Sequence, residues 1–419
     1  MKINLNKTIL YIIASLFIVF VVFNNLEQKE TIETANKPKP YYEEVIITTQ
    51  VDEKNIAKLD EEKAKLQQIG LIQKLKLKHN QSYTMAADEK NLYILTIASD
   101  NLYNTSQNEK KTGNFLEVYD LASLELKHYV KLGEKKDTFN HYNTIEVNDT
   151  HIYIGTRNAY VMYSPKDDPF SNRPFKVLEN KGHRGKINGI KAHKEYLFVY
   201  DEGGNIVVFR NNKYLYMIQT YPKIAPKTKY ILEANKWGSL FDVEIKENIF
   251  YASNDLGIIY MFAFSQSGSK FIGGFETAEY DKEKNRHDAD DIPDMIFYNQ
   301  NLLFSREYSG LSSYNTKTDR FDFTKKTLYP KKIVYSEILE EDIDITPSTD
   351  ISQMLLYKDH LIFHEHTKKI SVYSFKEEKI VHTFEGVSDD VFDIEVVGDR
   401  LFSLGADGVV YVWDLGVIE

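Results

Sequence analysis

The chain has 419 residues and contains no cysteine and no cluster of basic residues. Without cysteine it can form no disulfide bond and cannot be attached to a membrane through a lipidated cysteine. Acidic residues outnumber basic ones by 62 to 52, which gives a formal net charge of −10. Since nucleic acids require a positively charged surface, this balance argues against nucleic-acid binding.

The signature motifs of common enzymes are also missing. There is no nucleophile elbow, no phosphate-binding glycine-rich loop and no metalloprotease helix motif. The pairs Gly203-Gly204 and Gly273-Gly274 are isolated, as in turns or bulges. We therefore expect no catalytic activity and no cofactor.

What is present is a strand pattern that occurs seven times. Each copy opens with an apolar residue, two mostly polar or small residues and a second apolar residue, followed by a turn and a β-branched or aromatic run. Such runs, bounded by Asn, Asp and Gly, are typical of strands joined by short hairpins. The openings are Tyr83–Ala86, Tyr142–Ile145, Ile187–Ile190, Leu240–Val243, Ile292–Met295, Ile351–Met354 and Val391–Ile394.

Further segments complete four strands per copy. A third strand follows in several copies, and residues 130–132, 176–178, 214–219 and 381–384 can form outer strands. The seventh copy is followed by no such segment. The alternating segment Leu71–Leu77, upstream of the first copy, can supply its outer strand and close a ring, which removes exposed strand edges.

The last copy carries the residues of a known family. Leu401–Asp414 contains an Asp407-Gly408 turn and ends in Trp413-Asp414, and Gly182-His183 precedes the third copy. These residues resemble the WD40 family, specifically its bacterial, membrane-anchored periplasmic type. The resemblance implies an all-β, seven-bladed β-propeller. It also implies a His, Ser, Asp and Trp tetrad in each blade, which no copy here keeps complete: the third has Gly203 in the turn, and the seventh has Val387 in place of His.

The N-terminal segment suggests a compartment. Ile9–Phe23 is apolar and uncharged and follows Lys2 and Lys7. It spans only about 22 Å, so flanking residues must help it to cross a bilayer as a transmembrane helix. We expect an uncleaved anchor with the propeller in the periplasm; the alternative is a cleaved signal peptide and a soluble periplasmic protein.

Three regions follow from these patterns. Residues 1–26 form the anchor, residues 27–70 a linker and a short charged helical stalk, and residues 71–419 the propeller. In this family the connections between blades and the turns between second and third strands emerge on one face, which we call the top face. Binding residues usually lie on such loops.

The top-face loops contain aromatic, arginine and acidic residues, which are typical of protein interfaces. Candidate partner-binding residues are Tyr142, Arg184, Trp237, Asp288, Asp290, Asp291 and Tyr308. A metal site is an alternative, with His287, Asp288, His364 and His366 as candidate ligands, provided that three or four of them converge on one ion.

We therefore expect a periplasmic scaffold or accessory factor that serves an envelope or respiratory complex by binding a protein in the periplasm or inner membrane. The alternative is a sensor or enzyme-like propeller that binds a small ligand or metal at its top face or in its central channel.

Overall fold

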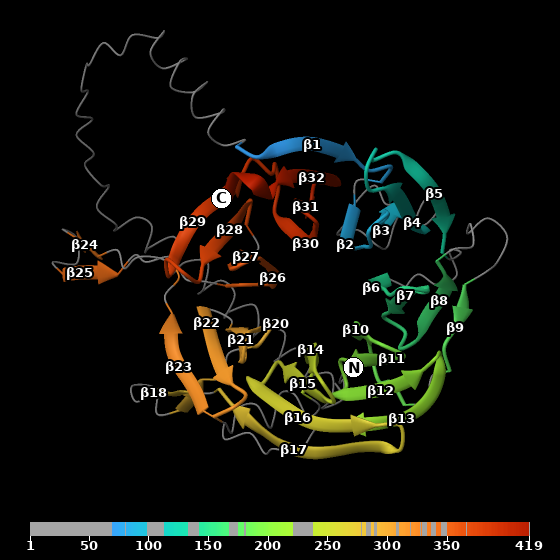
Figure 1. Cartoon of the computed structure of the whole chain (residues 1–419), viewed down its shortest axis with the longest axis horizontal. Coiled ribbons are helices and arrows are strands. Elements are labelled where there is room, and N and C mark those ends of the chain that lie inside the picture. Colours follow the sequence, from blue (N-terminus) through green and yellow to red (C-terminus); the bar gives the residue numbers. More distant parts are fainter. Residues whose placement is uncertain are drawn as a thin grey trace, which may run out of the picture. The chain divides into compact units, whose positions relative to one another are not determined.

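Each predicted repeat folds into one antiparallel sheet of four strands, and the seven sheets form a closed ring around a central axis in the computed structural model (Figure 1). The fold expected from the repeats is thus confirmed. The structure describes residues 69–79, 81–98, 113–132, 142–166, 175–179, 182–220, 238–277, 279–281, 286–288, 291–306, 310–318, 320–326, 328, 333–336, 341–344, 350–365 and 367–418. The expected anchor and stalk lie outside these residues.

The blades follow one another along the chain, from the innermost to the outermost strand. Blades 1 to 3 are β2–β5 (Gln81–Ala87, Asn91–Ala98, Gly113–Asp120, Leu126–Lys131), β6–β9 (Tyr142–Val147, His151–Thr156, Val161–Pro165, Lys176–Val177) and β10–β13 (Ile187–His193, Tyr196–Asp201, Asn205–Arg210, Lys213–Gln219). Blades 4 and 5 are β14–β17 (Leu240–Lys246, Ile249–Asn254, Ile258–Ser265, Gly268–Glu276) and β20–β23 (Met295–Tyr298, Asn301–Arg306, Gly310–Asn315, Arg320–Lys326). Blade 6 is β26–β29 (Gln353–Tyr357, His360–His364, Lys369–Ser374, Lys379–Glu385), and blade 7 is β30–β32 (Val391–Val397, Arg400–Gly405, Val409–Asp414) with β1 (Leu71–Lys76).

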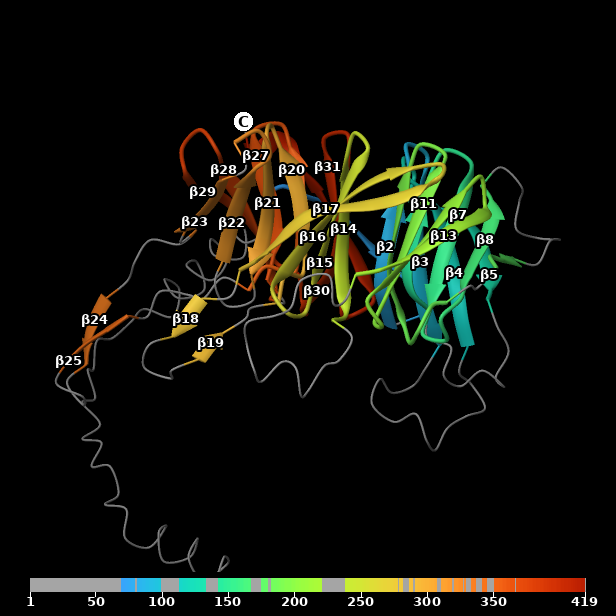
Figure 2. The same cartoon turned by 90° about the horizontal axis from the view of Figure 1, so that it is seen from below.

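Two additional hairpins lie between blades. They pair β18 (Glu279–Asp281) with β19 (Arg286–Asp288) and β24 (Ile333–Ser336) with β25 (Glu341–Asp344). Figure 2 shows β18 and β19 outside the ring on one face. The sequence pattern did not predict these hairpins, because their strands are short and are surrounded by polar residues of the connections.

The core is divided among the seven junctions between blades. Each hydrophobic cluster joins two consecutive blades, and the seven clusters together complete the circle. Second and third strands are therefore packed on both faces, as β11 and β12 show by burying almost every residue. Outer strands such as β5 expose alternate residues instead.

The predicted closing strand is confirmed. β1 pairs antiparallel with β32, and further backbone bonds join Leu77 N to Gly408 O at 3.1 Å and Asp414 N to Gly70 O at 2.7 Å. Gly70 has a φ of +86°, and a Cβ there would lie 3.1 Å from Phe384, so the turn into β1 favours glycine. The edge of blade 7 is thereby covered.

The innermost strand is bulged at one equivalent position in five blades. One or two residues fall out of the pairing in β2, β6, β10, β14 and β30. A bulge re-aims the side chain that it leaves unpaired. The residues concerned are Tyr83, Asn143, Asn188, Phe241 with Asp242, and Phe392. All but Tyr83 come from the middle of the predicted openings; Tyr83 is the first residue of its opening, which shows that the predicted register of the first copy is one residue too late.

Side chains at or beside these positions reach the backbone of the next blade. Asp393, for example, accepts a hydrogen bond of 2.7 Å from Met85 N and so joins blade 7 to blade 1. Equivalent bonds occur at five other junctions: Asn143 to Ile187 O, Asn188 to Leu240 O, Asp242 to Met295 N, Asp294 to Met354 N, and Gln353 to both Ile394 N and O. We call these bonds the inter-blade clamps.

The WD40-type tetrad is partly rebuilt in the seventh blade. Trp413 is buried and its indole N–H donates to Ser403 Oγ at 2.9 Å. Asp407 accepts hydrogen bonds from Tyr411, at 2.7 Å, and from Ser388. A tyrosine and a serine thus bind the turn aspartate where the family has His.

Within the described residues, no helix is long and apolar enough to cross a membrane.

The closing strand yields a stability prediction. Leu77 is 3% exposed and packs in the cluster between blades 7 and 1, so Leu77→Ala should lower the free energy of unfolding by about 2–5 kcal/mol. Ile72 in β1 is 55% exposed, and Ile72→Ala should change it by no more than about 0.5 kcal/mol. Urea unfolding of both variants measures the difference. If both variants changed the free energy of unfolding by the same amount, the stability of blade 7 would not depend on the burial of this segment.

Candidate functional site

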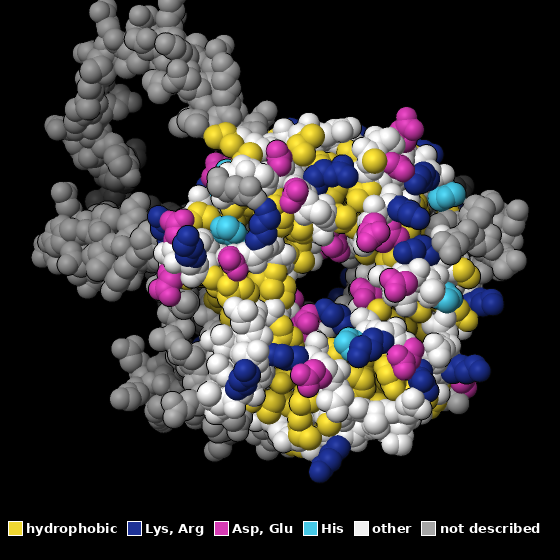
Figure 3. Space-filling model, in the orientation of Figure 1, with side chains coloured by type: hydrophobic (Ala, Val, Ile, Leu, Met, Phe, Trp, Pro, Cys, Tyr) yellow, Lys and Arg dark blue, Asp and Glu magenta, His cyan; other side chains and the backbone are white. Residues whose placement is uncertain are grey.

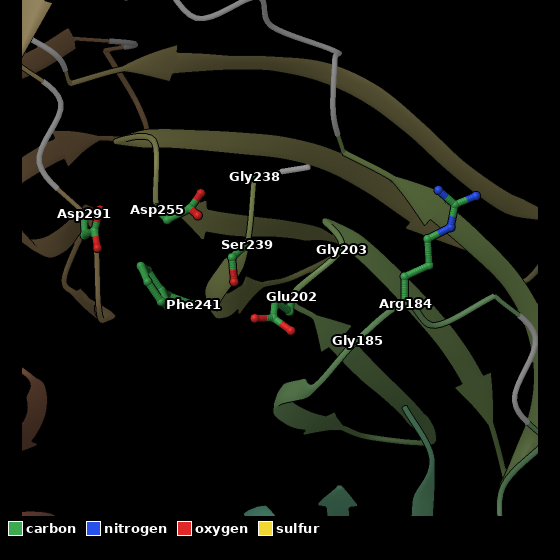
Figure 4. Close-up of a pocket in the computed structure, with 9 residues that line it drawn as sticks. All are labelled: Arg184, Gly185, Glu202, Gly203, Gly238, Ser239, Phe241, Asp255 and Asp291. Carbon is green, nitrogen blue, oxygen red and sulfur yellow. The ribbon is translucent and has the colours of Figure 1, made fainter. Parts of the chain in front are cut away.

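A pocket of about 660 Å³ opens on the top face at blades 3 to 5. Its walls come from connections that precede blades 3, 4 and 5 and from turns between second and third strands, as expected for this face. The ring brings these segments together although they lie far apart in sequence. The lining residues are Arg184, Gly185, Glu202, Gly203, Gly238, Ser239, Phe241, Asp255 and Asp291 (Figure 4).

The blade 3 side of the pocket is organised by Asp201. This carboxylate is fully buried and accepts hydrogen bonds from Arg184 N at 2.8 Å and Gly203 N at 2.9 Å. His183 Nδ1 lies 3.1 Å from it. Asp201 therefore holds the connection and the turn against each other. A Cβ on Gly203 would lie 2.7 Å from Arg184 Cβ and 3.0 Å from its carbonyl oxygen, so only glycine allows this approach.

The sequence assigned Gly203 to the position of the family's turn aspartate. The structure shows that Asp201, two residues earlier, pairs with His183 instead. The third blade thus keeps the His–Asp contact by using the last residue of β11.

The blade 4 side is organised in the same way. Asn254 Oδ1 accepts hydrogen bonds from Leu256 N at 3.1 Å and Ile258 N at 2.9 Å. This turn presents Asp255, whose backbone N–H donates to Ser239 O at 3.0 Å. Burial raises the pKa of the Asp255 carboxyl to about 6, and nearby Glu202 adds to the rise.

The pocket carries three carboxylates and one guanidinium. Glu202, Asp255 and Asp291 line it together with the half-buried ring of Phe241. Figure 4 shows the Arg184 side chain extending away from the other drawn side chains. The arrangement can hold a cationic group, and its ring and serine hydroxyl can contact a peptide.

Two candidate partner-binding residues, Arg184 and Asp291, line this pocket. Tyr142 begins β6, and Asp288 ends β19 opposite Glu279, but the structure does not describe their side chains. Trp237, Asp290 and Tyr308 lie outside the described residues. Their roles remain predictions.

The candidate metal ligands are not brought together in the part of the chain that is described. His364 ends β27 and is 1% exposed, His287 lies in β19, and His366 lies outside the described residues. Among the described residues, no group of three or more His, Asp or Glu could hold a metal ion.

Sequence reasoning missed Glu202, Phe241 and Asp255. A signal was present, because Glu202 and Asp255 each follow the last residue of the second strand in consecutive repeats. Phe241 belongs to the repeat opening, where the pattern shows mostly polar or small residues.

A second group of charged residues surrounds the axis of the ring. Three positions after the first residue of the bulge, blades 2, 3, 4 and 7 carry Glu146, Lys191, Glu244 and Glu395. Lys191 forms an ion pair with Glu244, and Ala192 N donates to Glu146 at 2.9 Å. The clamp residues Asp242, Asp294 and Asp393 add three carboxyls. The space-filling view shows an opening at the centre of the ring with charged side chains around it (Figure 3).

Burial makes these carboxyls hard to ionise. It raises the pKa of Glu146 and Glu244 to about 7 and that of Asp393 to about 6, and it raises the pKa of Glu395 and Asp294 well above the ordinary values. Burial alone would lower the pKa of Lys191, but Glu244 and Asp242 raise it. The side chains of Lys191 and Glu244 are still 35% and 15% exposed, because they face the channel.

The chain resembles known proteins in fold and not in sequence. No protein-family model matches it, and no curated protein matches its sequence. The WD40 β-propeller domain of Doa1 superposes with a TM-score of 0.56 at 10% identity, over 82% of this chain and 96% of that one. A chain of a mitotic checkpoint complex superposes with a TM-score of 0.56 at 8% identity, over 82% and 91%. The computationally designed Ika8 protein gives 0.50 at 10% identity, over 82% and 100%. The neighbours include WD40 propellers, so the resemblance is confirmed at the level of the fold.

The channel carboxyls predict an unusual pH dependence. Their pKa values are higher in the folded than in the unfolded chain. At a pH between the unfolded and the folded pKa, the folded state therefore binds more protons than the unfolded state does. Their contribution to stability therefore falls as pH rises from about 5 through about 7. Glu395→Gln removes one such group, and the variant should gain in melting temperature over the unsubstituted chain as the pH rises above the ordinary pKa of a glutamate.

Thermal unfolding of both proteins across this range measures the effect. Glu89→Gln, on the exposed turn between β2 and β3, is the control and should follow the unsubstituted chain. A constant difference between the Glu395→Gln and unsubstituted curves would contradict the prediction.

Proposed function

We propose that this protein is a non-catalytic scaffold that binds a protein partner through its top face. The observation that carries the proposal is the pocket at blades 3 to 5, which combines Phe241, Arg184 and three carboxylates on a rigid frame. Aromatic and arginine side chains surrounded by polar residues are frequent hot spots of protein interfaces. The WD40 neighbours support the fold on which such a surface is built.

The partner surface extends, in this proposal, over the other top-face candidates. The sequence predicts that Tyr142, Trp237, Asp288, Asp290 and Tyr308 share the face on which Arg184 and Asp291 line the pocket. An acidic rim of this kind favours a partner with basic groups.

The cellular setting forms the second part of the proposal. A single-pass helix at Ile9–Phe23 anchors the protein in a bacterial inner membrane, and Lys2 and Lys7 keep the N-terminus in the cytoplasm. The propeller then serves an envelope or respiratory complex in the periplasm. The absence of cysteine is compatible with that oxidising compartment.

A small-ligand sensor is the second candidate function. It is favoured by the pocket volume of about 660 Å³, which lies within the range of small-molecule sites.

Site-specific photo-crosslinking tests the scaffold. A benzophenone amino acid at Glu202 or Asp291, in the pocket, should give one reproducible protein adduct in cells, because these positions lie in the proposed interface. The same probe at Glu89 or Asp149, on exposed short turns of the opposite face, should not give it. Identical adduct patterns at all four positions would argue against a top-face partner.

Charge reversal separates binding from folding. The double variant Glu202→Lys/Asp291→Lys should lose the adduct formed from a probe at Ser239, while its melting temperature changes by only about 1–2 °C, because surface charges contribute little to stability. An undiminished adduct would show that these carboxylates do not bind the partner, and the absence of any adduct at Ser239 in the unsubstituted background would favour the small-ligand function.

Protease accessibility tests the membrane topology. In spheroplasts, added protease should degrade the propeller or its linker while cytoplasmic control proteins survive, because the proposed anchor exposes residue 41 onward to the periplasm. The protein should also sediment with the membrane. A soluble product that starts between residues 24 and 36 would show a cleaved signal peptide instead.

A further inference from the structure

Two aromatic side chains flank the top of the channel at the junction of blades 7 and 1. Tyr83 and Phe392 are the residues left unpaired by the bulges of β2 and β30, and their rings stack with centroids 5.9 Å apart. Tyr83 is 37% exposed and Phe392 is half-buried. At the equivalent position of blades 2 and 3, Asn143 and Asn188 form clamps.

A carboxylate lies below this pair. Glu395 follows Phe392 by three residues on β30, about 10 Å along the strand. Its charge interacts with Glu146 of blade 2 and Lys191 of blade 3. Neither blade is a neighbour of blade 7, so these interactions reach across the axis, and the Glu395 side chain faces into the channel. Within the described part of the chain it accepts no hydrogen bond.

The charges around Glu395 do not balance. Its surroundings contain Asp393 on its own strand and Glu146 across the axis, while Lys191 is already paired with Glu244. Asp242 and Asp294 lie in the same ring of innermost strands. Burial and these like charges raise the pKa of Glu395, so an additional cation would be stabilised beside it. Among the described residues no group is arranged to hold a metal ion, which favours an organic cation.

We infer that the central channel binds one basic side chain, a lysine or an arginine, which the protein partner inserts from the top face past the stacked rings of Tyr83 and Phe392 to reach Glu395. The aromatic faces attract the cation during insertion. Glu395 supplies a charge-assisted hydrogen bond. This inference rests on the proposed scaffold function and adds the chemistry that the partner must present.

Selection of short random peptides displayed on phage against the whole chain tests the inference. The selected peptides should contain a lysine or arginine whose replacement by glutamine weakens binding about tenfold or more in fluorescence anisotropy. Glu395→Gln should weaken the same peptides to a similar extent, and the two changes should not add, because they remove one interaction. Tyr83→Ala should weaken binding several-fold.

The controls separate binding from folding and from general charge. Glu395→Gln removes a costly buried charge, so its melting temperature should equal or exceed that of the unsubstituted chain, and loss of binding cannot then be attributed to unfolding. Glu89→Gln removes the same charge from the opposite face and should bind like the unsubstituted chain.

Three outcomes would overturn the inference: peptides that need no basic residue, undiminished binding by Glu395→Gln, or displacement of the peptide by an equal concentration of spermidine, which would show a site for free amines. A top-face adduct in the cross-linking experiment together with any of these outcomes would leave the scaffold function standing.

Discussion

The ring depends on polar side chains of the innermost strands that bind the backbone of the next blade. Apolar contacts between blades are non-directional and would allow two sheets to slide. A hydrogen bond from Asp393 to Met85 N, or from Gln353 to both backbone groups of Ile394, fixes one register. Since these bonds lie near the start of the innermost strands, close to the top face, they also determine where each connection leaves the ring. The positions of the connections that form the pocket walls therefore depend on these inter-blade clamps.

The same device concentrates carboxyl groups around the axis. Each clamp aspartate stabilises a junction locally, yet Asp242 raises the pKa of buried Asp294, and Asp393 raises that of Glu395. Lys191 compensates only part of this charge. The channel is therefore less favourable electrostatically than the blades around it. This excess of carboxyl groups is a reason to expect that the channel binds a partner, since a bound cationic group can compensate the negative charge that the folded chain leaves unpaired.

The strands could be predicted because period-2 patterns and turn residues act locally. Six openings and the closing strand lie where the pattern indicated, whereas in the first copy the bulge and the clamp align Ser82–Met85, one residue earlier than the predicted Tyr83–Ala86. The pocket could be predicted only in part, since Arg184, Phe241, Asp255 and Asp291 meet through the curvature of the ring, which no local pattern encodes. The alternation of His364 with His366 suggests paired ligands. The structure buries His364, whereas His366 lies outside the described residues, so the pairing stays a prediction.

The closing strand has a consequence for biosynthesis. Residues of β1 contact partners more than 300 positions later in the chain, as the 331-residue separation between Lys76 and Asp407 shows. A nascent chain that leaves the ribosome therefore carries its first strand without a mate until the final blade has been made. During translation or translocation, that unpaired segment is the part of the propeller most open to a chaperone or to mispairing with another copy. Its alternate lysines, Lys74 and Lys76, oppose such self-association by charge repulsion.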